Sequence, residues 1–200
     1  MINIDLPIVV ATQLRCEGRE GLVFDLASLT LRPGVTLVQG PEGSGKTSLL
    51  RVLAGERHLL GSHLQRAPGT EVYWANPNVA VDEQHSASDY FKTLTAQYAH
   101  WSTARLHGFA DALGMADHLE KPLYMLSTGT KRKVWLCAAV ASGAALTLLD
   151  EPFAALDSRS IATVLEVLTE AATTPHRAWV IADYLPPRGV PLTQTIVLGA

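Results

Sequence analysis

The chain has 200 residues, is 48% hydrophobic, and carries 16 basic against 19 acidic residues, for a formal net charge of −3. This length predicts one compact unit, the hydrophobic content is ordinary for a globular α/β protein, and the charge balance excludes an overall basic surface for nucleic acid. Cys16 and Cys137 lie far apart and form no CxxC pair or group with the histidines, which favours a reducing cytoplasm over a metal site. The start, MINIDLPIVV, has no basic segment and does not resemble a secretory signal.

Residues 1–39 alternate short apolar runs with turns, and we expect strands in IVVATQLRC, LVFDLASLTL and VTLVQ. The third run, residues 35–39, follows the turn pair Pro33-Gly34 and leads directly into GPEGSGKT, residues 40–47. After it, TSLLRVLAG places leucines at helical spacing and reaches Gly55, a glycine that can end a helix. The order of strand, glycine-rich loop and helix is the context in which a P-loop works.

The stretch GPEGSGKT fits the phosphate-binding pattern G-x-x-x-x-G-K-[ST]. Its glycines allow successive backbone N–H groups to point into one concavity and hold phosphate oxygens. Lys46 can then reach the β and γ phosphates, and Thr47 can offer its hydroxyl to Mg²⁺. The alternative is a structural glycine turn, but the flanking strand and helix favour a nucleoside triphosphate. The candidate binding residues are Gly40, Pro41, Glu42, Gly43, Ser44, Gly45, Lys46, Thr47 and Ser48.

The middle of the chain changes from strand to helix character. TEVYWAN, residues 70–76, is a further strand candidate. Beyond it, SASDYFKTLTAQYA opens with serines that can cap a helix, and TARLHGFADALG ends on Gly114. The apolar run at residues 134–149 is shorter than the ~20 residues that a helix needs to cross a bilayer, and Ser142-Gly143 divides it into a helix end and a buried strand. We therefore expect a helical insertion inside an α/β core.

Two further segments can carry chemistry. LTLLDEP places Asp150 and Glu151 at the end of an apolar strand, where one carboxylate can hold Mg²⁺ and the other can polarise an attacking water. A strand that simply exits into a turn would look the same. LSTGTKRKV, residues 126–134, joins a serine and a glycine to a helix start and is a candidate anion site, with an N-cap followed by a solvated basic face as the alternative. A helix over roughly 158–172, the strand AWVIAD and the run TIVLG complete the chain.

The order of these segments carries a family resemblance. GPEGSGKT, LSTGT, TLLDE and AALD (154–157) resemble the Walker A, signature, Walker B and D-loop series of ATP-binding cassette (ABC) ATPases, over nearly the whole chain. Within that family, the short length and the segments LRCEGREGLVFDLASLTLRPG and YWANP are similar to the ATPase subunits of haem-handling cytochrome c maturation transporters. The fold class that the resemblance implies is α/β, a P-loop NTPase of ABC ATPase type, with a mixed β core and an inserted helical subdomain.

The resemblance also implies an organisation and a set of roles. A single ABC domain over residues 1–200 would have a core of about 1–76 and 142–200 and a helical subdomain of about 77–141. Two such domains would dimerise head to tail, with ATP between the P-loop of one and the signature of the other. By position, Ser127 and Gly129 would touch the γ-phosphate across the dimer, and Asp157 would couple the two sites. Glu151 would be the catalytic carboxylate.

Several positions depart from the family pattern. Asn76 stands where a glutamine usually senses the γ-phosphate, and it would join Thr47 and Asp150 as a ligand of Mg²⁺. The signature has Thr128 and Thr130 where glycine and glutamine are usual, and a β-branched residue there would crowd a close backbone approach to phosphate.

Two further places depart from the family pattern, namely the loop after AWVIA and the position of the aromatic on which adenine would stack. The switch histidine expected after AWVIA is absent, and Asp183, the catalytic candidate here, or Tyr184 stands in its place. An aspartate repels a phosphate where a histidine could donate to it. Phe24 is the nearest aromatic to the place of the adenine platform, but a core aromatic is the favoured interpretation for it.

The expected function is that of an ATP-binding and hydrolysing subunit of an ABC transporter, which drives a separate integral membrane subunit in haem export for cytochrome c biogenesis. It would work with ATP and Mg²⁺ in a homodimer or heterodimer of cassettes, without nucleic acid, on the cytoplasmic face of the inner membrane. Export of another substrate is one alternative, because specificity would lie in the membrane partner. Another is a degenerate cassette that acts as a nucleotide-dependent switch with little turnover. Asp183, Thr128 and Thr130 favour the switch, and Glu151 opposes it.

Overall fold

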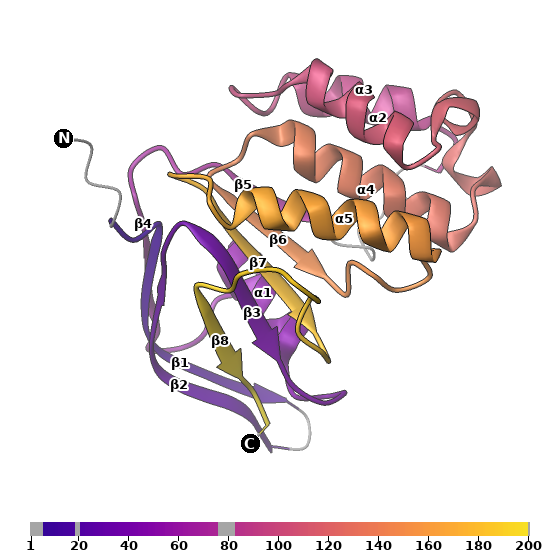
Figure 1. The fold of residues 1–200 in the computed structure, drawn as a ribbon. Helices are drawn as coiled ribbons and strands as arrows, with labels where there is room; N and C mark the ends of the chain where they lie inside the picture. Colours follow the sequence, from indigo (N-terminus) through magenta and orange to yellow (C-terminus); the bar gives the residue numbers. More distant parts are fainter. Residues whose placement is uncertain (1–5, 19–20, 76–82, 200) are drawn as a thin grey trace.

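A parallel sheet lies at the centre of the computed structural model, which describes residues 6–18, 21–75 and 83–199 (Figure 1). Within these residues it has five strands in the order β5-β6-β7-β3-β8, and every neighbouring pair is parallel. Because both of its faces are covered, the inner strands LTLLD and AWVIAD are apolar almost throughout. The strands are β3 (Gly34–Gln39), β5 (Val72–Ala75), β6 (Leu146–Asp150), β7 (Ala178–Asp183) and β8 (Gln194–Val197).

A smaller antiparallel sheet, with the strand order β2-β1-β4, covers one side of the molecule. Helix α1 (Lys46–Ala54) packs between the two sheets, since its buried leucines share one apolar cluster with residues from both. In Figure 1 this helix lies behind β3 and β7. The strands of the small sheet are β1 (Val9–Gly18), β2 (Gly21–Leu31) and β4 (His63–Arg66).

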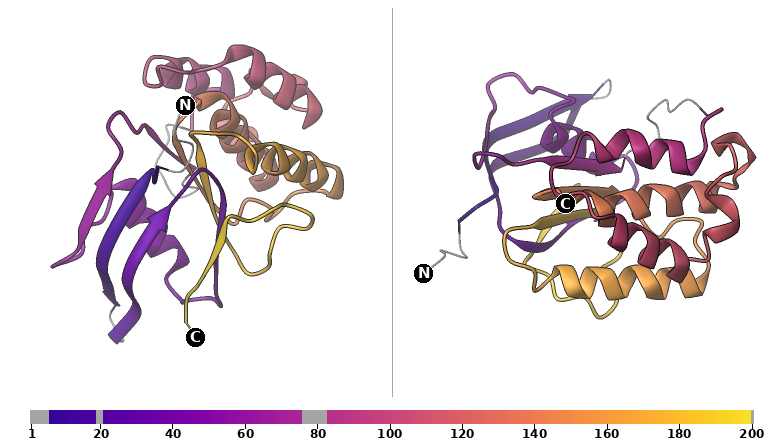
Figure 2. Two further views of the ribbon diagram at one scale, coloured as in Figure 1. Left: turned by 60° about the vertical axis from the view of Figure 1, so that its left-hand side comes forward. Right: turned by 90° about the horizontal axis from the view of Figure 1, so that it is seen from above.

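Helices cover the opposite face of the parallel sheet. Trp179 and Ile181 of β7 point toward them, whereas Val180 and Ala182 point toward α1, as the period of two in a strand requires. α4 and α5 lie next to the sheet, and α2 and α3 pack outside α4 (Figures 1 and 2). The helices are α2 (Ala87–Thr95), α3 (Thr103–Ala112), α4 (Thr128–Ser142) and α5 (Ser158–Ala171), with short 3₁₀ helices at Ala116–His118 and Leu123–Met125.

The helix ends confirm the capping signals in the sequence. Ser86 opens α2 with a capping box, in which its side chain accepts from the Asp89 N–H while the Asp89 carboxylate faces the Ser86 N–H. Gly55 and Gly143 end α1 and α4 with φ of 87° and 65°, in the left-handed region that favours glycine. Among the described residues, no helix combines the length and the apolar character needed to span a membrane.

One strand, β4, was not predicted from the sequence. β4 reads His-Leu-Gln-Arg and has a single apolar residue, so it shows no alternation that would predict a strand. It pairs antiparallel with β1 at the edge of the small sheet, where one side of the strand has no neighbouring strand among the described residues and polar side chains are favourable. The other predicted strands and the α/β class with a mixed β core are confirmed.

Candidate functional site

The carboxyl ends of three adjacent strands bring the candidate residues to one edge of the parallel sheet. β3 ends at Gln39 and runs into residues 40–47, β6 ends at Asp150, and β7 ends at Asp183. The register sets Gln39 beside Asp183 and Asp150 beside Ala182. The crevice outside the carboxyl ends of the strands is where open α/β sheets bind their ligands.

The loop of residues 40–47 has a backbone that requires glycine. Gly43 and Gly45 have φ of 76° and 93°, in the left-handed region. A Cβ atom on Gly45 would lie 2.5 Å from a methyl carbon of Val23, so β2 packs directly on the loop. α1 starts at Lys46, and its first N–H groups have no acceptor within the helix. The loop and the helix start therefore form a cradle that suits an anion.

A buried hydroxyl in this loop supports the same conclusion. The Ser44 side-chain oxygen is buried and has no hydrogen-bond partner among the described residues. Buried polar atoms nearly always have a partner, so an unpaired one in a phosphate-type loop fits a site built for a polar ligand.

Lys46 is held at the loop by three contacts. Its side chain is largely buried, with 6% of the residue exposed. The Nζ ammonium donates to the carbonyl oxygens of Gly40 and Pro41 at 2.8 and 3.0 Å. The ring of Tyr184 covers the same ammonium, with 4.1 Å between Nζ and the ring centroid. The positive charge thus stands at the phosphate loop itself.

Thr47 and Asp150 form a pair of oxygen groups beside this charge. The Thr47 hydroxyl donates to Asp150 Oδ2 at 2.6 Å. Burial raises the pKa of Asp150, while the Thr47 hydrogen bond opposes the rise. A hydroxyl and a carboxylate side by side are ligands that suit Mg²⁺, so the donor set fits this ion. Asn76, the third predicted ligand, lies outside the described residues.

The backbone that carries Glu151 is fixed from two sides. Glu151 follows β6 with φ of 46°, and its N–H donates to the Ala182 carbonyl of β7 at 2.9 Å. From α4, the guanidinium of Arg132 donates to the carbonyl oxygens of Asp150, at 3.2 Å, and of Glu151. The chain segment that carries the two carboxylates is therefore tied to both β7 and α4.

The basic run at the start of α4 does not form the solvated face that the sequence allowed. Lys131 pairs with Glu83 at 2.6 Å, Lys133 pairs with Asp157 at 3.1 Å, and Arg132 is half-buried against the end of β6. Successive residues of an α-helix point about 100° apart, so three in a row cannot share one direction. That spacing rules out one shared solvated face, but it does not by itself tell which of the three side chains faces inward.

Ser127 and Gly129 lie at the start of α4, against the segment that precedes α5. Ser127 caps α4 by accepting from the Thr130 N–H at 3.1 Å. A Cβ atom on Gly129 would lie 2.3 Å from the Ala155 carbonyl oxygen. Asp157 caps α5 by accepting a backbone N–H, and this bond together with the Lys133 ammonium lowers the pKa of Asp157. Within one chain, LSTGT and AALD thus contact each other.

This close approach gives a stability prediction. Gly129→Ala should lower the free energy of unfolding by about 1–3 kcal/mol, because the added methyl group meets a backbone oxygen that must shift. Gly108→Ala in α3 is the matched control, since a Cβ atom there has nothing within 4 Å. Alanine is the better helix former, so the control should stabilise by about 0.5–1 kcal/mol. Urea unfolding curves measure both, and equal effects of the two substitutions would contradict the contact at Gly129.

Phe24 belongs to the core and not to a stacking surface. It is 4% exposed, and its ring lies 2.8 Å from where a Cβ atom on Gly45 would be. A hollow of about 570 Å³ lies between the adjoining ends of β1 and β2 and the phosphate loop. Leu22, which is 56% exposed, lines this hollow, whose volume is within the range of small-molecule pockets.

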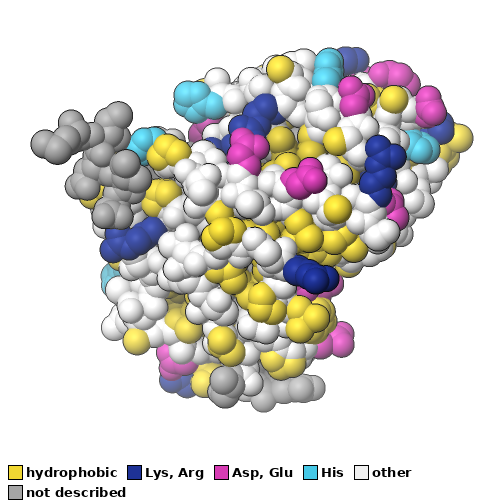
Figure 3. Space-filling view, in the orientation of Figure 1, with side chains coloured by type: hydrophobic (Ala, Val, Ile, Leu, Met, Phe, Trp, Pro, Cys, Tyr) yellow, Lys and Arg dark blue, Asp and Glu magenta, His cyan; other side chains and the backbone are white. Residues whose placement is uncertain are grey.

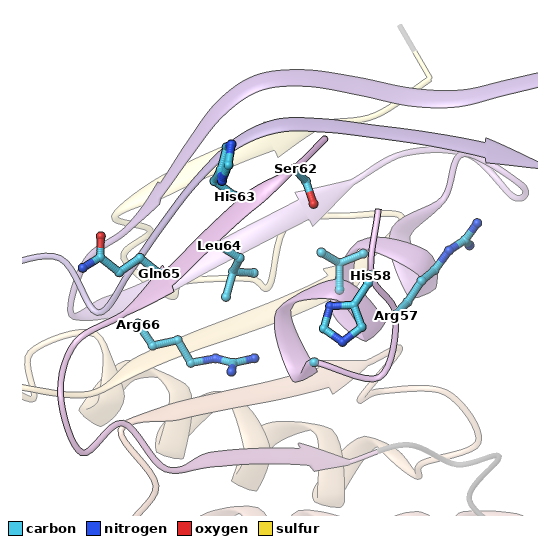
Figure 4. Close-up of a pocket in the computed structure, with 9 residues that line it drawn as sticks. Arg57, His58, Ser62, His63, Leu64, Gln65 and Arg66 are labelled. Atoms are coloured by element: carbon cyan, nitrogen blue, oxygen red, sulfur yellow. The ribbon is translucent and has the colours of Figure 1, made fainter. Parts of the chain in front are cut away.

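A cavity of about 510 Å³ between α1 and β4 is lined by several basic side chains (Figure 4). The side chains do not converge, because Leu64 and Arg66 point toward α1 whereas His63 and Gln65 leave the other face of the strand. Arg66 donates to the Leu53 carbonyl at 2.6 Å and so caps the end of α1. None of the residues that line this cavity belongs to the loop of residues 40–47.

A phosphate loop between a strand and a helix, set at the carboxyl edge of a parallel sheet next to a strand that ends in a carboxylate, defines the class of P-loop nucleoside triphosphatases. Residues 24–154 match the family model described as ABC transporter. The match covers more than half of the chain, so the protein belongs to the ABC transporter family, as an ATP-binding subunit that hydrolyses ATP. Such subunits work with membrane components of the transporter.

Relatives of known description agree with this assignment. The cytochrome c biogenesis ATP-binding export protein CcmA of Pseudomonas savastanoi pv. phaseolicola is 34% identical over 167 residues, covering 78% of each chain. The protein of the same name from Methylococcus capsulatus is 36% identical over 188 residues, covering 82% of this chain and 84% of the relative. A solved ATP-binding subunit of an ABC transporter has a TM-score of 0.81 at 16% identity, covering 96% of this chain and 85% of that chain, and shows the shared fold.

Proposed function

We propose that this chain is the ATP-hydrolysing subunit of an exporter that acts in cytochrome c biogenesis, with haem as the exported cargo. The observation that carries the proposal is the similarity to cytochrome c biogenesis ATP-binding export proteins, at 34% and 36% identity over most of both chains. A separate membrane subunit would recognise the cargo, and this chain would supply the energy of ATP hydrolysis.

The residues at the sheet edge would have separate roles in binding and hydrolysing ATP. The β and γ phosphates would lie in the loop of residues 40–47, facing Lys46. Thr47, Asp150 and Asn76 would hold Mg²⁺, which neutralises charge on the phosphates when bound. Glu151 would orient and polarise the attacking water, since its backbone is fixed by β7 and α4.

Two cassettes would close head to tail on the nucleotide. Ser127 and Gly129 of one cassette would face the γ-phosphate held by the other, and Asp157 would couple the two sites. Their place at the start of α4, a helix of 15 residues, supports this role, because helix N-termini favour anions. A helical subdomain of about 77–141, inserted into a core of about 1–76 and 142–200, is part of the same proposal.

The dimer would lie on the cytoplasmic face of the inner membrane, against an integral membrane subunit. Nucleic acid is not an expected partner. The net charge is −3, and on the face drawn in Figure 3 the Lys and Arg side chains are interspersed with Asp and Glu over the helices.

A nucleotide-dependent switch with little turnover is the second candidate function. The observation that favours it is the absence of histidine from the loop after β7, where Asp183 and Tyr184 stand. Thr128 and Thr130 in the signature favour it as well. The presence of Glu151, a carboxylate able to polarise water, opposes it.

A complementation experiment tests the proposed function and separates the candidates. Deleting the gene for this chain from its source organism should abolish covalent haem in c-type cytochromes, as measured by haem staining of gels. The wild-type chain should restore it, and Glu151→Gln should not, because hydrolysis is required for export. Unchanged cytochromes after deletion would point to another cargo. Full restoration by Glu151→Gln would instead favour the switch.

A further inference from the structure

Tyr184 is the first residue after β7, and its ring lies at the phosphate loop. The ring centroid is 4.1 Å from Lys46 Nζ, although 138 positions separate the two residues. An ammonium has three protons to donate, and two of them go to the carbonyl oxygens of Gly40 and Pro41. The aromatic ring therefore covers the side of the ammonium that the loop leaves open, which is the side from which a phosphate can approach.

The backbone around Tyr184 is held so that its ring faces the loop. The Tyr184 N–H donates to Asp183 Oδ1 at 2.7 Å, and the Tyr184 carbonyl accepts from Gln39 Nε2 at 2.9 Å. Gln39 ends β3, the strand that leads into the phosphate loop. Because the Asp183 carboxylate is engaged by its own loop, its role in this arrangement is to set the direction of the next residue.

We propose that Tyr184 is the catalytic residue of this loop, and that its phenol donates a hydrogen bond to the γ-phosphate of ATP where a histidine would otherwise do so. Asp183 is then a positioning residue. The inference rests on the proposed ATP hydrolysis and names a further group in the same site. Two observations support it. The Tyr184 ring covers the open side of the Lys46 ammonium, and hydrogen bonds hold both the N–H and the carbonyl of Tyr184.

The charges near the phenol agree with a donor role. The charge of the Glu151 carboxylate and partial burial raise the pKa of Tyr184, and Glu42, a hydrogen bond from the phenol to Glu151 and Asp183 act in the same direction. The phenol therefore keeps the proton that any tyrosine carries at neutral pH, and to donate to a phosphate it would exchange Glu151 for the phosphate as its acceptor. A protonated phenol can donate to a phosphate oxygen, which an aspartate at the same place could not do without repulsion. Tyr184 is also 44% exposed, so a nucleotide can reach the ring without unfolding the loop.

Nucleotide binding to the full-length chain distinguishes this proposal from a structural role. Tyr184→Phe keeps the ring over Lys46 and removes only the hydroxyl. It should weaken binding of a non-hydrolysable ATP analogue with Mg²⁺ by about tenfold, the effect of losing one hydrogen bond to a charged group. Affinity for ADP, which has no γ-phosphate, should stay within about twofold, since a hydrogen bond that is never made costs nothing when it is removed. Tyr184→His should retain the preference for the ATP analogue, because imidazole supplies a donor.

Three outcomes would overturn the proposal. Equal affinities of wild type and Tyr184→Phe for the analogue would show that the phenol is not at the γ-phosphate. A rise in affinity for both nucleotides in Tyr184→Ala, with Tyr184→Phe unchanged from wild type, would show that the ring only caps Lys46. A larger change of the analogue-to-ADP ratio in Asp183→Asn than in Tyr184→Phe would assign the contact to Asp183.

A control and the wild-type reference complete the experiment. Tyr124→Phe removes a phenol that is 55% exposed and should change neither affinity. Wild-type binding and hydrolysis of ATP report on the proposed function by themselves. Failure of the wild type to bind the analogue would reject that function, whereas normal wild-type binding with an unaffected Tyr184→Phe would reject only the role of Tyr184.

Discussion

Glu151→Gln should lower the rate of ATP hydrolysis by about 10²-fold or more while ATP binding is kept. Glutamine has the size and hydrogen-bonding capacity of glutamate but lacks the charge that polarises the attacking water. The backbone of residue 151 is held by the Ala182 carbonyl and by Arg132, so the substitution should leave the position of the side chain unchanged. The loss should therefore appear in kcat and not in the affinity for ATP.

Two measurements test the Glu151→Gln variant. Steady-state hydrolysis by the transporter complex gives kcat, and size-exclusion chromatography of the variant with MgATP should show a dimer that accumulates because the sandwiched nucleotide is not cleaved. Glu166→Gln is the matched control, an exposed glutamate of α5 that should behave as wild type. Hydrolysis within a few-fold of wild type would remove Glu151 from the catalytic role. A monomer at every nucleotide concentration, alone and with the membrane subunit, would contradict the head-to-tail dimer.

The sequence predicts the phosphate loop well because all of its determinants are local. Gly43, Gly45 and Lys46 lie within a few positions, and the strand before them and the helix after them are equally visible as short patterns. The same holds for the caps at Ser86 and Gly143, where one residue decides how a helix begins or ends. Parallel neighbours then bring the ends of β3, β6 and β7 to one edge without further information.

Contacts between distant segments could not be predicted in this way. Arg132 and the Glu151 carbonyl are 19 positions apart, and their contact depends on how α4 packs against β6. The contact of Tyr184 with Lys46 depends on the path of the loop after β7, which is fixed by Gln39 from another strand. Strand β4 could not be predicted either, because its residues are mostly polar and an edge strand needs no apolar alternation.

Phe24 lies in the core, which is the interpretation that the sequence favoured over an adenine platform. Its position ahead of the phosphate loop made it the nearest aromatic for an adenine platform. Packing of β2 under Gly45 instead buries its ring, since a glycine without Cβ lets the aromatic side chain come close. A candidate chosen by its place in the sequence thus takes its role from the face of the strand on which it lies.

Lys46→Ala should weaken MgATP binding by about 10- to 100-fold, the loss expected from one charge-assisted hydrogen bond to phosphate, and should abolish measurable turnover. The Lys46 ammonium already lies at the loop, between the carbonyl oxygens of Gly40 and Pro41 and the ring of Tyr184. It is therefore the cation placed to meet phosphates bound in this loop. Isothermal titration with ATP and ADP measures the affinities, and a hydrolysis assay measures turnover.

The same substitution also removes the two hydrogen bonds that Lys46 makes to the loop, so its effect on folding must be separated from its effect on binding. Thermal unfolding without nucleotide gives the first, and the shift of the melting temperature on adding MgATP gives the second, because only a ligand of the native state raises it. Lys92→Ala is the control for loss of a lysine, since this side chain is 75% exposed on α2 and pairs only at the surface. The control should keep the full MgATP-induced shift, and Lys46→Ala should lose most of it. If Lys46→Ala keeps both the shift and the hydrolysis of the wild type, residues 40–47 are a structural turn and the nucleotide binds elsewhere.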